Sequence, residues 1–110
     1  MGHKLIALTA SKPGKEEAFK AWYRDVHVSE VLAVPGVSNA HVTPLGATMG
    51  YVPWQQIATF DLEGDDPQAV VDEIQRRIGS GEIQLHDAIE MTAVSLITYD
   101  DGAGGAGTKP

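Results

Sequence analysis

The sequence contains no cysteine, which excludes disulfide bonds, cysteine-ligated zinc, iron–sulfur clusters and a thiol nucleophile. Positive charge is also scarce, because 8 Lys and Arg stand against 15 Asp and Glu and give a formal net charge of −7. Proteins that bind nucleic acid neutralise phosphates with clustered Lys and Arg, and anionic membranes attract the same residues. The composition therefore argues against both nucleic acid and a membrane surface as partners.

Long hydrophobic runs are absent as well. No apolar run approaches the ~20 residues of a transmembrane helix, and the N-terminal MGHKLIALTA lacks the features of a signal peptide. We therefore expect a cytoplasmic protein. Apolar residues make up 43% of the 110 residues, which is typical of a globular chain and predicts a single domain over residues 1–99. The Gly- and Ala-rich segment 100–110 is predicted to be a flexible tail.

Two segments have helical patterns. The first runs from Lys15 to about Val34 and ends at Pro35-Gly36, because proline disfavours helical geometry in the residue before it. The second begins at Asp66-Pro67, where Asp66 is a suitable N-cap, and Gly79 is its expected C-cap. The apolar face of the first helix consists of Phe19, Trp22, Tyr23 and Val26, and that of the second of Val70, Val71, Ile74 and Ile78.

Four further segments are predicted to be strands, and the connection over residues 82–89 is either a short helical turn or irregular. The element order β-α-β-β-α-β indicates the α+β class and a ferredoxin-like fold, with a four-stranded antiparallel sheet and both helices on one face. Apolar residues occur on both faces of the strands, as at Leu5 and Ile6, so the second face also needs a cover. A second copy of the sheet is the simplest cover and predicts a homodimer. The predicted strands are Lys4–Thr9, Val37–Leu45, Trp54–Leu62 and Met91–Tyr99.

One segment has a more specific pattern. Residues 22–36, WYRDVHVSEVLAVPG, resemble the first-helix signature of the EthD-like branch of the dimeric α+β barrel superfamily, roughly W-Y-x-x-x-H-x-x-E-x-L-x-x-P-G. The resemblance implies a homodimeric barrel, a pocket between each sheet and its helices, and usually no bound metal or organic cofactor. It does not imply one reaction, because the relatives include polyketide cyclases, dehydratases, cofactor-free oxygenases and dehalogenating enzymes.

The same helix carries two titratable residues close to its apolar face. On a regular helix Val26 lies within that face, Glu30 also lies inside it, and His27 lies at its margin, about 80° from Phe19. One hypothesis makes His27 a general acid or base that Glu30 orients or makes more basic. The alternative is structural: His27 hydrogen-bonds a backbone group, and Glu30 leaves the apolar face where the helix bends near Val28.

Other candidate site residues lie outside the helix. Asn39 and His41 share one face of a predicted strand, so they converge with His27 if that face meets the helices, or lie in a dimer interface if it meets the partner. His86 lies in the least regular segment and is either a pocket residue or a surface histidine. The histidines are far apart in sequence and form no local pair, so we expect no metal site.

These features favour an enzyme without a cofactor that transfers a proton on a small carbonyl or phenolic compound, as a lyase or dehydratase, a cyclase or an isomerase. His27 is the expected acid or base, and Tyr23 or His41 the expected hydrogen-bond donor to a developing oxyanion. Two alternatives stay open: a cofactor-free oxygenase on the same scaffold, and a non-catalytic binding protein or structural dimer. The expected substrate-binding residues are Phe19, Trp22, Glu30, Asn39 and His86.

Overall fold

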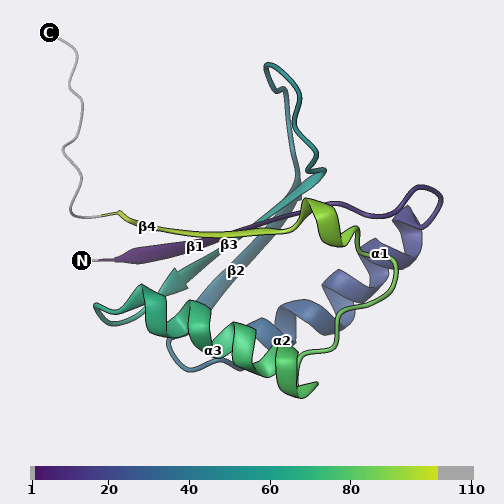
Figure 1. Cartoon of the computed structure of the whole chain (residues 1–110). Coiled ribbons are helices and arrows are strands. Elements are labelled where there is room, and N and C mark those ends of the chain that lie inside the picture. Colours follow the sequence, from purple (N-terminus) through teal and green to yellow (C-terminus); the bar gives the residue numbers. More distant parts are fainter. Residues whose placement is uncertain (1, 102–110) are drawn as a thin grey trace, which may run out of the picture.

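The computed structural model describes residues 2–101, and Figure 1 shows the arrangement of its elements. Residues 102–110, which make up nearly all of the predicted tail, lie outside the described part. No helix in the described part is long and apolar enough to cross a membrane. The elements are β1 (His3–Thr9), α1 (Glu16–Trp22), η1 (Tyr23–His27), α2 (Val28–Leu32), β2 (Val37–Pro44), β3 (Gln56–Leu62), α3 (Pro67–Ser80), η2 (Met91–Ala93) and β4 (Ser95–Asp100).

The sheet has the strand order β2-β3-β1-β4, and its neighbouring strands pair antiparallel within the described residues. The central strands β1 and β3 pair with each other, although the first helical region and β2 lie between them in the sequence. Figure 1 shows α1, α2 and α3 on the same side of the sheet, with the β2–β3 hairpin projecting on the other side. This arrangement confirms the predicted ferredoxin-like α+β fold.

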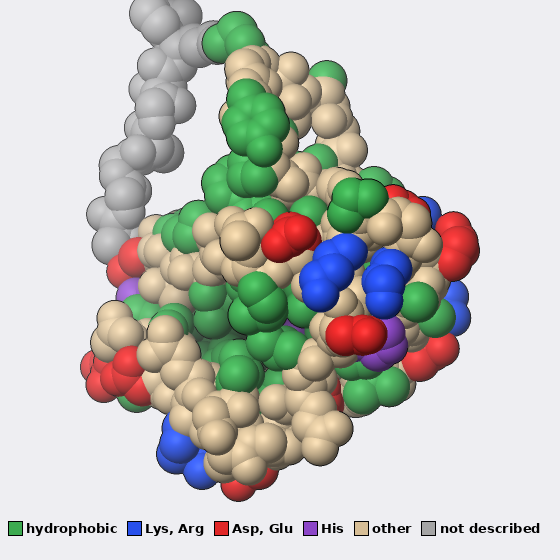
Figure 2. Space-filling view, turned by 45° about the vertical axis from the view of Figure 1, so that its right-hand side comes forward, with side chains coloured by type: hydrophobic (Ala, Val, Ile, Leu, Met, Phe, Trp, Pro, Cys, Tyr) green, Lys and Arg blue, Asp and Glu red, His purple; other side chains and the backbone are tan. Residues whose placement is uncertain are grey.

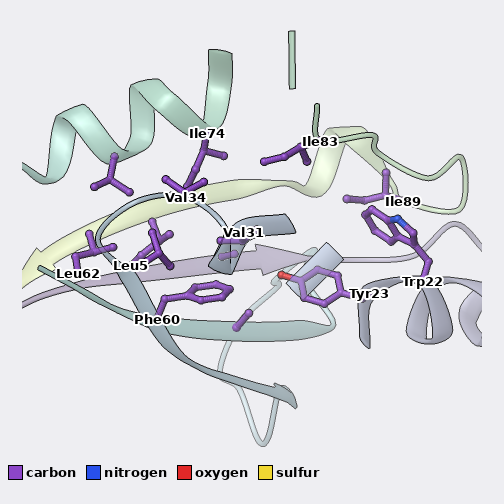
Figure 3. Close-up of a cluster of buried hydrophobic side chains, with 14 of the residues drawn as sticks. Leu5, Trp22, Tyr23, Val31, Val34, Phe60, Leu62, Ile74, Ile83 and Ile89 are labelled. Carbon is purple, nitrogen blue, oxygen red and sulfur yellow. The ribbon is translucent and has the colours of Figure 1, made fainter. Parts of the chain in front are cut away.

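The hydrophobic core lies between the sheet and the helices. Leu5 of β1 and Phe60 of β3 are opposite each other in the ladder, and both are almost fully buried. Residues of the other parity, such as Ile6 and Ile97, pair with each other on the face that no helix covers. Because strand side chains alternate between faces, this register divides the apolar residues into a core set and an outer set. Figure 3 shows the core set, to which Leu62, Val31, Val34 and Ile74 also belong.

Element boundaries differ from the predictions mainly at chain reversals. The N-cap prediction is confirmed, because the Asp66 carboxylate accepts a hydrogen bond of 3.2 Å from the Ala69 N–H. The C-cap prediction was wrong: α3 continues through Gly79 to Ser80, and Gly81 ends it in the left-handed conformation with φ of 86°. Residues 81–90 form no regular helix before η2, which agrees with the irregular alternative. Met91 begins a 3-10 turn instead of a strand.

Candidate active site between the sheet and the helices

The first helix is not regular, and its irregularity positions the candidate site. Tyr23–His27 form a single π-helical stretch between α1 and α2. The Val28 N–H bonds to the carbonyl of Tyr23, five residues earlier, whereas the Tyr23 N–H bonds to Phe19, four residues earlier. Such a wide turn adds one residue to the helix and is frequently found at functional sites. It rotates every following side chain relative to a regular helix.

This rotation reverses the predicted positions of two neighbours. The regular helix placed Val26 on the apolar face, and that prediction was wrong, because Val26 is 45% exposed. His27 was expected at the margin and is instead 9% exposed. The buried residues Tyr23, His27 and Val31 recur every four residues, a spacing that drifts by about 40° per step on a regular helix. The wide turn compensates for that drift and keeps the three side chains on one face. The four-residue spacing is therefore the feature of the sequence that indicates the wide turn.

Aromatic rings hold the imidazole of His27 in place. The ring of Trp22 stacks on it with centroids 4.7 Å apart, and the ring of Tyr23 meets it edge-on at 4.9 Å. Phe19 packs against both Trp22 and Tyr23 at about 6 Å. Trp22 and Tyr23 are themselves buried, so the imidazole has little freedom to rotate. The predicted walls Phe19 and Trp22 thus support His27 and do not line the main cavity beside it.

A cavity of about 300 Å³ lies between the helices and the inner face of the sheet. His27 and Tyr23 line it together with the hydroxyl-bearing residue Thr9 and, from α3, Gln75. The rest of the lining is apolar, and no Lys, Arg, Asp or Glu belongs to it. Figure 2 shows a hollow in the molecular surface whose floor is made of hydrophobic side chains. The apolar lining residues are Leu5, Ala7, Val31, Phe60, Val71, Ile74, Ile78, Leu85, Ile89, Val94 and Leu96.

Helix α3 and strand β4 contribute lining residues that were not predicted as site residues. Val71, Ile74 and Ile78 of the predicted apolar stripe line the cavity, and Val71 also packs against the core. Ile74 also packs in the core with Leu5 and Phe60 of the sheet, so α3 covers both the core and the cavity. Helical periodicity identifies the apolar face of α3, but it does not reveal that part of this face borders a cavity.

Tyr23 brings a hydrogen-bond donor to the cavity. Its side chain is 1% exposed, and burial raises the pKa of its hydroxyl to about 12. Tyr23 therefore stays protonated throughout the physiological range. Figure 3 shows its hydroxyl directed toward the side where Val31 and Phe60, both lining residues, lie. Within the described residues this hydroxyl makes no hydrogen bond to another protein group, which leaves it available to a ligand oxygen.

Burial also changes the chemistry of His27. Removal from water lowers the pKa of its imidazole below the ordinary 6.5, and the neighbouring Glu30 carboxylate opposes that shift without cancelling it. The neutral imidazole is the form that accepts a proton. His27 is therefore unprotonated at neutral pH and able to accept a proton, next to the phenol of Tyr23, which keeps its own proton. A base and a donor at one cavity are the two groups that enolate and phenolate chemistry requires.

Glu30 lies behind His27 and is not part of the cavity lining. Its Oε1 atom is 3.5 Å from Nδ1 of His27, and its side chain is 20% exposed. Its other carboxylate oxygen accepts a hydrogen bond of 3.3 Å from the backbone N–H of Gln84. Glu30 thus lies close to His27, as expected. It is not positioned to contact a ligand in the cavity, because it does not belong to the lining.

His86 contacts Trp22 and is not among the residues that line the cavity. Its ring is 5.9 Å from that of Trp22, and its Nδ1 accepts a hydrogen bond of 2.9 Å from the backbone N–H of Ala88. Nδ1 is also 3.1 Å from a carboxylate oxygen of Asp87. These contacts order the segment 81–90 against α1. They do not bring His86 into the cavity lining, and its proposed role in substrate binding is not supported by its position.

Asn39 and His41 lie away from the cavity. Asn39 has φ of 54°, and the pairing of β2 with β3 shifts its register between Ser38 and His41. His41 lies opposite Thr59, whose parity is that of the outer face, and the amide of Asn39 donates a hydrogen bond of 2.7 Å to Asp61. The register thus places His41 on the outer face of the sheet, away from the helices. His41 is consequently not placed to act with His27.

No group of three or more His, Asp or Glu among the described residues is arranged to hold a metal ion.

Comparison with known proteins then bears on the fold. No family model matches the sequence, and no curated relative matches it either. The crystal structure of an ethyl tert-butyl ether D (EthD) family protein from Bacillus halodurans is similar, with 22% identity and a TM-score of 0.63 over 92% of this chain and 99% of the other. The chain therefore has an EthD-like fold.

Proposed function

We propose that this chain is a cofactor-independent enzyme that transfers a proton on a small, uncharged carbonyl or phenolic compound. The observation that supports the proposal is the cavity of about 300 Å³ in which a buried histidine and a buried tyrosine are the neighbouring polar groups. Ligand pockets in proteins are typically apolar, begin at about this volume and contain a few convergent polar groups. The absence of charged residues from the lining favours a neutral ligand over a carboxylate or phosphate.

The chemistry follows from the protonation states. Neutral His27 takes a proton from an acidic C–H or O–H of the ligand, and the electron pair that is left moves to the ligand oxygen. The Tyr23 hydroxyl, with its pKa raised to about 12, donates a hydrogen bond to that oxygen without losing its proton. Return of the proton from His27 to another ligand atom completes an isomerisation, and its delivery to a leaving hydroxyl completes a dehydration. Cyclisation by an aldol step uses the same two groups.

A homodimer forms part of this proposal. Ile6, Leu8, Ile57, Ile97 and Tyr99 share the outer face of the sheet, which no helix of the described chain covers. Sedimentation at micromolar concentration is expected to give a dimer, and Ile97→Arg to give a monomer. Leu32→Arg on α2, where the side chain is 38% exposed, is the matched control and should remain dimeric. A stable monomer of the unmodified chain contradicts this part of the proposal.

Hydrogen exchange on carbon tests the chemistry without knowledge of the natural substrate. A panel of small neutral ketones is incubated with the protein in D₂O, and deuterium at the α-carbon is measured by NMR. We expect exchange above the buffer rate for at least one ketone that saturates the protein, and a loss of roughly 10²–10⁴-fold in His27→Gln. Saturable binding without exchange indicates the non-catalytic alternative. Exchange that His27→Gln leaves unchanged overturns the assignment of the base.

A further inference from the structure

Two buried polar atoms face each other behind the cavity and lack hydrogen bonds. They are Nδ1 of His27 and Oε1 of Glu30, which are 3.5 Å apart and have no other partner in the described structure. A buried polar atom without a partner costs roughly 1–3 kcal/mol, so two such atoms at this distance strongly favour bonding to each other. Because a carboxylate only accepts hydrogen bonds, a bond between them requires the proton of the imidazole to be on Nδ1.

We propose that Glu30 is a positioning residue that holds the proton of neutral His27 on Nδ1, so that Nε2 is the basic atom presented to the cavity. This inference rests on the proposed function and adds to it the tautomer on which the base depends. A neutral imidazole carries one proton, and the nitrogen that lacks it is the one that can act as a base. Nδ1 is buried from solvent, so the remaining exposure of the ring belongs to its other atoms.

A second contact keeps the carboxylate of Glu30 in this orientation. Its Oε2 accepts a hydrogen bond of 3.3 Å from the backbone N–H of Gln84, in the irregular segment 81–90. The two oxygens of Glu30 thus face two different partners, one on its own helix and one on a segment more than fifty residues away in sequence. The ring of Trp22 stacks on the imidazole with centroids 4.7 Å apart, which limits tilting of the imidazole plane.

The other titratable groups near His27 do not accept a proton or a hydrogen bond from its ring, so Glu30 determines which ring nitrogen carries the proton. Tyr23, in edge contact with the ring, keeps its proton because burial raises its pKa to about 12. His86, on segment 81–90, contacts Trp22 and its Nδ1 is turned to the Ala88 N–H. Within the described residues, Glu30 provides the single carboxylate paired with His27. Its removal therefore has a specific expected effect on this ring.

Nitrogen NMR of ¹⁵N-histidine-labelled protein tests the inference directly, because the shifts of the two ring nitrogens report which one carries the proton. In the unmodified chain at pH 8 we expect the Nδ1–H form of His27 to dominate. Glu30→Leu removes the acceptor and should convert His27 largely to the Nε2–H form. Glu30→Gln keeps an oxygen acceptor but no charge, so it should retain the Nδ1–H form and lower the pKa of His27. Glu17→Gln, on exposed α1 surface, is the matched control and should change neither value.

The unmodified chain alone makes the test decisive, even if a variant fails to fold. A dominant Nε2–H form of His27 in that chain overturns the inference, and so does an unchanged tautomer in folded Glu30→Leu. Failure of the proposed function is read separately, from the carbon exchange assay with His27→Gln. If that exchange depends on His27, we expect Glu30→Leu to reduce it by more than 10-fold, and an undiminished rate contradicts a positioning role for Glu30.

Discussion

The wide π turn predicts an unusual pattern of tolerance along one helix. Val26→Gln and Val31→Gln each replace a valine by the same neutral, helix-compatible side chain, five residues apart. Val26 is 45% exposed, whereas Val31 is 5% exposed and packs in the core. On a regular helix Val26 would lie in the apolar face and Val31 about 120° from Phe19, outside that face, so the order of the two effects would be reversed.

The expected magnitudes follow from burial. Full burial of a valine side chain contributes about 1.5–3 kcal/mol, and a buried amide without a partner costs a further ~1–3 kcal/mol. Val31→Gln is therefore expected to lower the free energy of unfolding by about 3–5 kcal/mol. Val26→Gln should lower it by less than about 1 kcal/mol, because its side chain already contacts water.

Urea unfolding followed by circular dichroism measures both values on the same protein preparation. The m-value should stay constant, so that a change in the midpoint reports stability alone. An equal, large loss for Val26→Gln and Val31→Gln would refute the π turn and, with it, the burial of His27. A loss for Val26→Gln that exceeds the loss for Val31→Gln would do so as well.

Three further predictions concern single groups. The pKa of His27 is lower in the folded chain, so below pH 6.5 the unfolded chain takes up a proton that the folded chain does not. The free energy of unfolding should therefore fall from pH 6.5 toward pH 5, by at most about 1.4 kcal/mol per pH unit. It should fall less steeply in His27→Gln. Tyr23→Phe should change the melting temperature by less than ~4 °C, since its hydroxyl has no protein partner, but should weaken ligand binding measured by calorimetry. Asp66→Ala removes the N-cap of α3 and should cost about 1 kcal/mol in urea unfolding; an unchanged midpoint would show that the cap contributes nothing.

Much of the fold follows from local patterns in the sequence. The Asp66-Pro67 pair marks the start of α3, and alternation along β1 and β3 separates Leu5 and Phe60 from the outer face. These features depend on neighbours within a few residues, so a single sequence contains them. Gly79 and Gly81 are equally suitable as C-caps by residue type, so the sequence alone does not show that Gly81 ends the helix.

The site is harder to predict, because it depends on small shifts of register. One extra residue in the turn at Tyr23–His27 moves His27 inward and Val26 outward. One irregularity in the pairing of β2 with β3 places His41 on the outer face. The cavity is lined by side chains from the sheet, from the helices and from segment 81–90 together, which no property of a single helix reveals. The sequence identified His27, Tyr23 and Glu30 as candidates but not the way they are arranged.

The central claim is that neutral His27 and protonated Tyr23 act together on a ligand in the cavity. Carbon exchange in D₂O tests this most directly, because proton removal needs the base and the hydrogen-bond donor in the same step. We predict that a small neutral ketone that saturates the unmodified chain exchanges its α-hydrogen above the buffer rate, and that His27→Gln and Tyr23→Phe each lower this rate by roughly 10²-fold or more. An exchange rate that either folded variant leaves unchanged, at a ketone concentration that saturates it, would contradict the account.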